Sequence, residues 1–290
     1  MAPRGTQKRA AVESDSDSGD MDAIAASTQA VEAVEDTARK MVRYALSCEY
    51  SRVPVRKNAL TELCNTGAGG GRRGAAFKAV FPRAQRMLEE VWGMRLEELP
   101  LREKVTMAQR RAAQRAEKAT MSSNTWVLVS VLPAEMRGEA IVPPPKVPNA
   151  EEEAAYVGLY SFIVAVITLS GGSLGEAKLD RHLRRVNAES HTPVGSTDEV
   201  LKRMVREGYV VKIKDSSGGE EVVEYIVGGR GKVEVGEEGV AGLVRAVYGG
   251  DVDVEKKLER SLGLLRRDRG VVHRSAMTRA DEGDEMDVDE

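Results

Sequence analysis

The most apolar stretch of the chain runs from residue 154 to residue 175 and contains no charged residue. Only residues 156–169 are predominantly apolar, which is shorter than the roughly 20 residues that span a bilayer, and Gly171 and Gly172 then supply a helix stop. Its large apolar side chains recur at helical steps of three and four residues: Tyr156, Leu159, Tyr160, Ile163, Val166 and Ile167. We therefore predict a buried helix of a soluble domain rather than a membrane span.

The hydrophobic pattern divides the chain into two similar halves, each with three helical patterns followed by strand patterns. In the first half, helices are predicted at residues 28–50, 56–64 and 77–92, and a strand at 126–132. In the second half, helices are predicted at residues 154–170, 176–186 and 197–207, and strands at 209–214 and 221–227. Three helices and a two-stranded hairpin make a winged helix. The sequence thus predicts a mainly α fold with small β-hairpins, organised as two winged-helix domains in tandem.

Composition sets the limits of these domains. We place the first winged-helix domain at residues 27–132 and the second at residues 154–265, where two further helical patterns at 237–248 and 251–265 close it. Between the domains, residues 133–153 are rich in proline, which is typical of a linker of limited flexibility.

The two ends of the chain are acidic, although the formal net charge is only -3. Acidic residues crowd positions 13–22 and 281–290, whereas basic residues dominate much of the middle. Segments with so few apolar residues do not offset the entropy of ordering, so residues 1–26 and 266–290 are predicted to be disordered tails. The N-terminal tail is either a solubilising segment alone or also a substrate of an acid-directed kinase, through Ser14, Ser16 and Ser18.

Residues that carry chemistry are too sparse to predict a catalytic or metal centre. Cys48 and Cys64 lie far apart with no histidine cluster beside them, which argues against a disulfide framework or a zinc site and favours a reducing compartment. The three histidines lack metal-ligand spacing, and no serine lies in a nucleophile elbow. Residues 69–74 match a dinucleotide fingerprint, but they follow a helical pattern rather than a strand, so a flexible link is favoured. We predict a protein that is not an enzyme and has no metal or other cofactor.

Basic side chains collect on the second half. Helix 197–207 has apolar residues for the core on one side and basic residues on the other. The candidate DNA contacts lie on this helix, on the helix before it and on the strand after it: Lys178, Arg181, Arg184, Arg185, Lys202, Arg203, Arg206, Lys212 and Lys214. Such side chains contact phosphates of double-stranded DNA with an affinity that depends on salt and not on base sequence. Because Asp180, Glu199 and Glu207 are interspersed, an ordinary solvated face is the alternative.

Seven short segments occur in the order in which one known family has them. In the first half they are Met-Val-Arg-Tyr-Ala-Leu at 41–46, Pro-Val-Arg-Lys-Asn-Ala-Leu at 54–60, residues 77–94, and Thr-Trp-Val-Leu-Val-Ser-Val-Leu at 125–132. In the second half they are residues 160–172, Glu-Gly-Tyr-Val-Val at 207–211, and Val-Glu-Tyr-Ile-Val-Gly at 223–228. Over about residues 34–248 the chain resembles the MAGE homology domain, a tandem winged-helix fold. Within that family it is most similar to the non-SMC subunits of the DNA-repair complex built on the fifth and sixth structural-maintenance-of-chromosomes (SMC) proteins.

The resemblance implies a scaffold in a nuclear chromosome-maintenance complex, with no membrane and no small-molecule substrate. It implies that the first winged helix and the cleft between the halves hold a RING-type subunit, and that the second winged helix holds a segment of the kleisin subunit. By position, the residues toward the RING-type subunit are Met41, Val42, Ala45 and Leu46, and those toward the kleisin are Tyr160, Ile163 and Val164. Each of these is alternatively a plain core residue. The alternative function is an adaptor that stimulates a RING ubiquitin ligase with little direct DNA binding.

The chain departs from the family pattern at two informative places. Ala45 and Leu46 stand where the family usually has paired leucines, which leaves a smaller apolar knob for the RING-type subunit. Pro82 falls where the family usually continues a helix, and a proline is best tolerated in the first turn of a helix.

Overall fold

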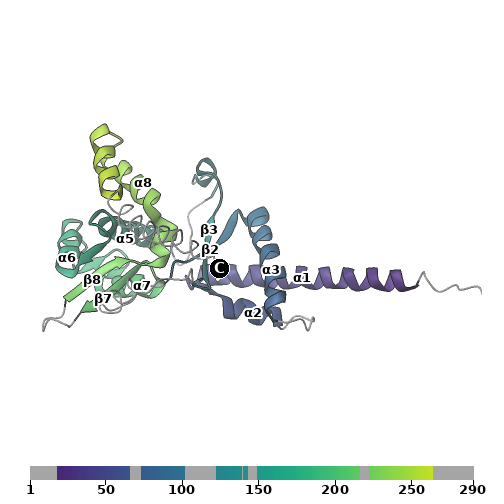
Figure 1. Cartoon of the computed structure of the whole chain (residues 1–290). Coiled ribbons are helices and arrows are strands. Elements are labelled where there is room, and N and C mark those ends of the chain that lie inside the picture. Colours follow the sequence, from purple (N-terminus) through teal and green to yellow (C-terminus); the bar gives the residue numbers. More distant parts are fainter. Residues whose placement is uncertain are drawn as a thin grey trace, which may run out of the picture. The chain divides into compact units, whose positions relative to one another are not determined.

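The computed structural model describes residues 18–65, 73–101, 122–138, 140–142, 149–215 and 222–263. Over these residues the chain is mainly helical with small sheets, as predicted (Figure 1). It divides into two compact units. The first comprises Met1–Cys48 and Val55–Gly93, and the second comprises Glu49–Pro54 and Met94–Glu290. The short segment Glu49–Pro54 therefore belongs to the second unit, although residues of the first unit precede and follow it in sequence.

The first unit contains most of α1 (Ser18–Tyr50), followed by β1 (Val55–Arg56), α2 (Lys57–Asn65), α3 (Arg73–Met87) and the π-helical turn η1 (Leu88–Trp92). Its buried side chains include Met41, Leu60, Val80, Ala84 and Leu88. Apolar residues at helical spacing on each element thus meet in one small core, as the pattern predicts.

Helix α1 begins at Ser18, so residues 18–26 are helical and the prediction that they are disordered is wrong. The physical reason lies in the local sequence. Asp20 and Asp22 lie near the start of the helix, where negative charge interacts favourably with the helix dipole, and three alanines follow within residues 23–26. The prediction of disorder weighed the acidic character of this stretch and missed its helix propensity. Residues 1–17 and 264–290 lie outside the described residues.

Helix α3 is held against α1 by an ion pair. Arg83 donates two hydrogen bonds to Glu35, from Nε to Oε2 at 2.6 Å and from Nη2 to Oε1 at 2.8 Å. The bonds from Arg83 hold the pKa of Glu35 below its ordinary value. Pro82 lies inside α3 rather than in its first turn, and it is exposed, as is Lys78 one turn earlier. Solvent is therefore available to the Lys78 carbonyl, which the proline nitrogen cannot bond.

The second unit is built around α5 (Ala150–Leu169), α6 (Glu176–Arg185) and α7 (Thr197–Glu207). Beside them lies an antiparallel sheet in the order β4-β8-β7, with β4 at Ser173–Gly175, β7 at Val210–Asp215 and β8 at Val222–Val227 (Figure 1). Strand β4 is an addition to the predicted hairpin of β7 and β8. By length and composition alone α5 could cross a membrane. In the structure, however, it supplies much of the core of this unit, so it is the buried helix that was predicted.

The remaining elements of the second unit are short, apart from α8 (Gly236–Tyr248) and a helix at residues 252–263. They are β2 (Met94–Glu98), which pairs antiparallel with β3 (Thr125–Ser130), the turn η2 (Ala134–Arg137), the small hairpin of β5 (His191–Thr192) and β6 (Gly195–Ser196), and the π-helical turn η3 (Gly231–Val235). The sequence analysis missed β2, because its pattern covers only five residues.

The start of α7 follows from its sequence. The Ser196 hydroxyl accepts a hydrogen bond from the Glu199 backbone N–H at 3.4 Å, so Ser196 is the N-cap of the helix. The helix ends at Gly208, whose φ of 88° is in the left-handed region that favours glycine. Both ends of α7 are therefore fixed by local interactions.

Candidate functional site

The predicted basic face lies on the surface of the second unit. On α6, Lys178, Arg181 and Arg185 are exposed at spacings of three and four residues, so they share one helical face. Arg184 is also exposed, but its Nη2 lies 2.5 Å from Oε1 of Glu189, four residues beyond the helix. Three of the four basic candidates on α6 have no ion pair within the described part of the chain.

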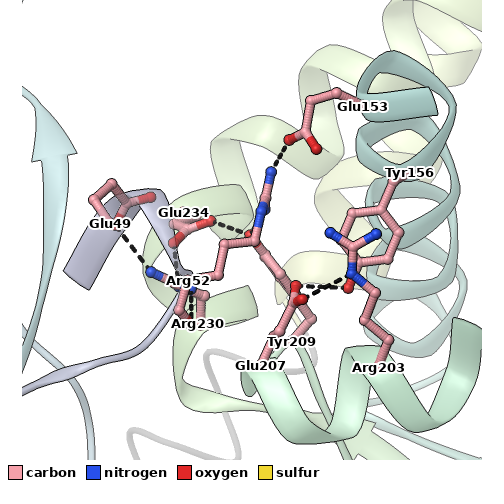
Figure 2. A network of polar contacts seen from close by, with 9 residues as sticks. All are labelled: Glu49, Arg52, Glu153, Tyr156, Arg203, Glu207, Tyr209, Arg230 and Glu234. Carbon is pink, nitrogen blue, oxygen red and sulfur yellow. Dashed lines mark hydrogen bonds and ion pairs between the residues drawn. The ribbon is translucent and has the colours of Figure 1, made fainter. Parts of the chain in front are cut away.

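On α7, too, the candidate DNA contacts comprise exposed cations without an ion pair and one arginine that has one. Lys202 and Arg206 are exposed one turn apart and have no ion pair among the described residues. Arg203 instead turns toward α5: its guanidinium carbon lies 3.7 Å from the centroid of the Tyr156 ring, and its Nε lies 2.8 Å from Oε1 of Glu207 (Figure 2). Arg203 therefore belongs to the packing of the unit more than to its free surface.

Strand β7 carries the last two candidates. Lys212 is half-buried, and its Nζ donates a hydrogen bond of 2.8 Å to Glu176, which raises the pKa of the lysine. Lys214 is exposed at the sheet surface. The structure thus brings the nine predicted residues to α6, α7 and β7, but it engages Arg184, Arg203 and Lys212 in ion pairs.

The predicted partner contacts lie mostly in the core. Leu46 is partly exposed on α1, whereas the other six are buried: Met41, Val42, Ala45, Tyr160, Ile163 and Val164. Their burial agrees with the alternative that they are plain core residues.

A polar network, which was not predicted from the sequence, surrounds a fully buried arginine. Arg230 follows β8 in the sequence Gly228-Gly229-Arg230-Gly231, and only 1% of its surface is exposed. The two outer glycines let this turn approach the end of α7 closely. A Cβ at Gly228 would lie 2.2 Å from the Gly208 carbonyl oxygen, and one at Gly231 would lie 2.5 Å from that of Tyr209. The turn is fixed by hydrogen bonds from the Arg230 N–H to Gly208 O (3.1 Å) and from the Gly228 N–H to Tyr209 O (2.8 Å).

The buried guanidinium of Arg230 binds the segment Glu49–Pro54 (Figure 2). Its Nη2 donates to Oε2 of Glu49 at 2.9 Å, its Nη1 donates to the backbone carbonyl of Arg52 at 2.7 Å, and its Nε lies 2.5 Å from Oε1 of Glu234 on η3. A buried cation is costly unless it is paired, so these partners are a condition for its burial. Arg230 thereby ties the end of α1 to the turn after β8.

Three tyrosines complete the network. Tyr156 and Tyr160 lie on α5, and Tyr209 follows α7. The Tyr156 hydroxyl donates to Glu207 at 2.8 Å, and the Tyr209 hydroxyl donates to Glu234 at 2.7 Å. Burial, reinforced by the charges of Glu207 and Glu234, raises the pKa values of Tyr156 and Tyr209 far above the ordinary range. Burial also raises the pKa of Glu234, which the charge of Arg230 opposes.

The groups with shifted pKa values and the exposed cations lie in different surroundings. Within the described residues, no group of three histidine, cysteine, aspartate or glutamate side chains is placed to hold a metal ion. The strongly shifted groups are tyrosines engaged with carboxylates in the core, and the exposed groups are cations on helices.

Comparison with known proteins identifies the family. The model of the MAGE homology domain matches residues 41–238 of this chain. The chain belongs to the MAGE homology domain family. The resemblance drawn from the seven sequence segments is thereby confirmed.

The chain is also similar to two individual proteins. It is 28% identical over 228 residues to Non-structural maintenance of chromosome element 3 of Schizosaccharomyces pombe, and the match covers 76% of this chain and 66% of the relative. The chain thus spans slightly less than two thirds of that relative. Its fold matches a chain of the solved Nse1-Nse3-Nse4 complex with a TM-score of 0.59 at 17% identity, over 79% of this chain and 98% of the other.

The buried tyrosines predict that the MAGE domain loses stability at alkaline pH. A tyrosine ionises near pH 10 in an unfolded chain, whereas Tyr156 and Tyr209 stay neutral in the folded chain to higher pH. Their stabilising contribution is therefore fully present below about pH 10 and is lost as the pH rises further. The melting temperature, followed by circular dichroism from pH 8 to pH 11, should fall steeply above about pH 10.

The matched control replaces both tyrosines with phenylalanine, which cannot ionise. The double variant should melt lower at pH 8, because it lacks two hydrogen bonds, but its melting temperature should fall less between pH 10 and pH 11. An equally steep fall in the double variant would contradict the role of these two side chains.

Proposed function

We propose that this protein is a non-catalytic scaffold subunit of a nuclear chromosome-maintenance complex, in which it bridges a RING-type subunit and a kleisin subunit and binds duplex DNA. The observation that carries the proposal is the match to Non-structural maintenance of chromosome element 3 over 228 residues. The fold shared with a chain of the Nse1-Nse3-Nse4 complex supports the same assignment. We further propose that the chain contains the two winged helices expected from sequence, at residues 27–132 and 154–265.

The second half supports the winged-helix proposal through its order of elements. Helices α5, α6 and α7 are followed by the antiparallel strands β7 and β8, and β4 between α5 and α6 completes the sheet. In a winged helix the third helix is the one that enters or approaches the DNA groove. In this chain that helix is α7, whose basic face is defined by Lys202 and Arg206.

The DNA contact proposed here rests on the cations that have no partner within the described residues. Lys178, Arg181 and Arg185 on α6 and Lys202 and Arg206 on α7 have no carboxylate to neutralise them there. An exposed cation already held by a carboxylate gains less from a phosphate, because the existing ion pair must first break. We therefore expect these five to contribute more than Arg184, Arg203 and Lys212.

A side chain that contacts a partner subunit must be exposed on the surface of this protein. Among the residues expected to face the RING-type subunit, Leu46 is partly exposed, and Tyr50 one turn later on α1 is 77% exposed. We propose that these two side chains, rather than the buried Met41, Val42 and Ala45, contact that subunit.

Charge reversal tests the DNA contact. The double variant Lys202→Glu with Arg206→Glu should bind a random DNA duplex at least ~10-fold more weakly at low salt, with a salt dependence shallower by about two ions. Fluorescence anisotropy over a salt series measures both quantities. The double variant Lys256→Glu with Lys257→Glu makes the same change of charge at exposed positions in the helix 252–263 and should bind nearly as well as the unchanged protein.

Equal loss in the two double variants would show a general charge effect and would contradict a contact on α7. Undetectable binding of the unchanged protein at low salt would favour the alternative function, an adaptor for a RING ubiquitin ligase with little direct DNA binding.

Co-expression tests the scaffold. With the RING-type and kleisin subunits of the same species, the protein should purify as a complex of all three, and Leu46→Asp with Tyr50→Asp should lose the RING-type subunit while keeping the kleisin. Val247→Asp, at an exposed position of α8, is the control and should keep both. Failure of both subunits to co-purify with the unchanged protein would contradict the proposal.

A further inference from the structure

Three tyrosine rings and one carboxylate of the second unit converge on a single point. Glu153, Tyr156 and Tyr160 follow one another on α5 at spacings of three and four residues, so they share one face of that helix. Tyr209 joins them from the residue that follows the C-cap of α7. All four are buried. We call this group the tyrosine cage.

The tyrosine cage is occupied by Arg52, a cation from a distant part of the sequence, which Figure 2 shows together with Glu153, Tyr156 and Tyr209. The guanidinium carbon of Arg52 lies 5.4 Å from the centroid of the Tyr156 ring and 5.9 Å from the centroids of Tyr160 and Tyr209. Its Nη1 donates to the Tyr209 hydroxyl at 2.5 Å, and its Nη2 forms an ion pair with Glu153. Aromatic faces together with one carboxylate are the groups that recognise a guanidinium ion.

The walls of the tyrosine cage are held without Arg52. Tyr160 and Tyr209 stack with their centroids 4.0 Å apart, and the edge of Tyr156 meets Tyr160 at 5.4 Å. The hydroxyls of Tyr156 and Tyr209 are bonded to Glu207 and Glu234, as described above. These contacts lie among residues of α5, α7 and η3 and their flanks, so removal of the Arg52 side chain leaves the rings in place.

The carboxylate of Glu153 makes a cation favourable inside the tyrosine cage. Its side chain is buried, and Arg52 is the one cation that pairs with it among the described residues. A buried carboxylate without a counter-charge is strongly unfavourable. An empty cage would therefore attract a cation of the same shape.

The segment that carries Arg52 has the features of a displaceable occupant. Arg52 has a φ of 51°, in the left-handed region where a non-glycine residue is strained. Its neighbours Tyr50 and Val53 are 77% and 49% exposed, and the Arg52 side chain and the bonds from Arg230 anchor the segment.

We propose that the tyrosine cage is a binding site for an arginine side chain, filled in cis by Arg52 and open to an arginine of a partner segment when Arg52 leaves. The site recognises the planar guanidinium group through the three rings, the Tyr209 hydroxyl and the Glu153 carboxylate. This proposal does not depend on the proposed function, because it concerns a pocket of this chain and the chemistry of its ligand.

Chemical rescue tests the site in the full chain. Arg52→Ala empties the cage and should lower the melting temperature. Methylguanidinium at 10 mM should then raise the melting temperature of Arg52→Ala by about 3 °C more than it raises that of the unchanged protein, whose cage is filled. Ammonium chloride at the same concentration controls for ionic strength and for an unshaped cation, and it should give no such difference.

A second variant tests whether the rise in melting temperature comes from methylguanidinium bound in the tyrosine cage. Arg52→Ala combined with Glu153→Gln lacks the carboxylate and should not be rescued. If Arg52→Ala is insoluble, Arg52→Gln, which keeps the length of the side chain without its charge, is tested in the same way. Two results would overturn the proposal: an equal rise in the melting temperatures of Arg52→Ala and the unchanged protein, or rescue that persists with Glu153→Gln. Arg52 would then only stabilise the fold.

Discussion

The buried guanidinium of Arg230 is the interaction on which the second unit of this MAGE domain depends. A cation with 1% exposure is tolerated only when it is paired, and here Glu49 and the Arg52 carbonyl accept hydrogen bonds from its two Nη atoms, while Glu234 forms an ion pair with its Nε. Two of those partners come from the segment Glu49–Pro54, which enters the unit from a distant part of the sequence. The close approach of the turn depends in addition on Gly228 and Gly231, where a Cβ would collide with backbone atoms. Charge and backbone geometry therefore select one position for this turn.

Some basic residues of the second unit belong to the buried polar network, and others are exposed. Arg52, Arg203 and Arg230 lie among carboxylates and tyrosine rings and stabilise the packing of α5, α7 and the turn after β8. Lys202 and Arg206 are exposed on α7, and they are the cations that we propose for the contact with a phosphate backbone. One helix thus carries both a structural arginine and the proposed DNA contacts, and its orientation is set by the Arg203, Glu207 and Tyr156 contacts.

Much of the architecture was predictable because it follows from local pattern. The spacing of Tyr156, Tyr160 and Ile163 predicted the buried helix α5, and the helical pattern at residues 197–207 predicted α7 with the bounds that the structure shows. The family was also predictable, because its segments keep their order along the chain. The start of α1 was not, since acidic composition was weighed above helix propensity in residues 18–26.

The polar network was not predictable, because its members lie far apart in sequence and none of them forms a motif. Arg52 and Tyr209 are separated by 157 positions, yet they share a hydrogen bond. The signal that was present is the Gly-Gly-Arg-Gly sequence at 228–231, where glycines on both sides of a charged residue indicate a close backbone approach. Likewise, a helical pattern does not distinguish an arginine that stacks on a ring, such as Arg203, from one that faces solvent, such as Arg206.

The most direct test of the account is hydrogen exchange in the segment Glu49–Pro54, measured by mass spectrometry on the unchanged protein and on Arg230→Gln. If Arg230 ties this segment to the second unit, peptides that cover it should exchange at least ~10-fold faster in Arg230→Gln, while peptides from β7 and β8 keep their protection. Unchanged exchange in the segment, with the variant still folded, would contradict the claim that the buried arginine holds it.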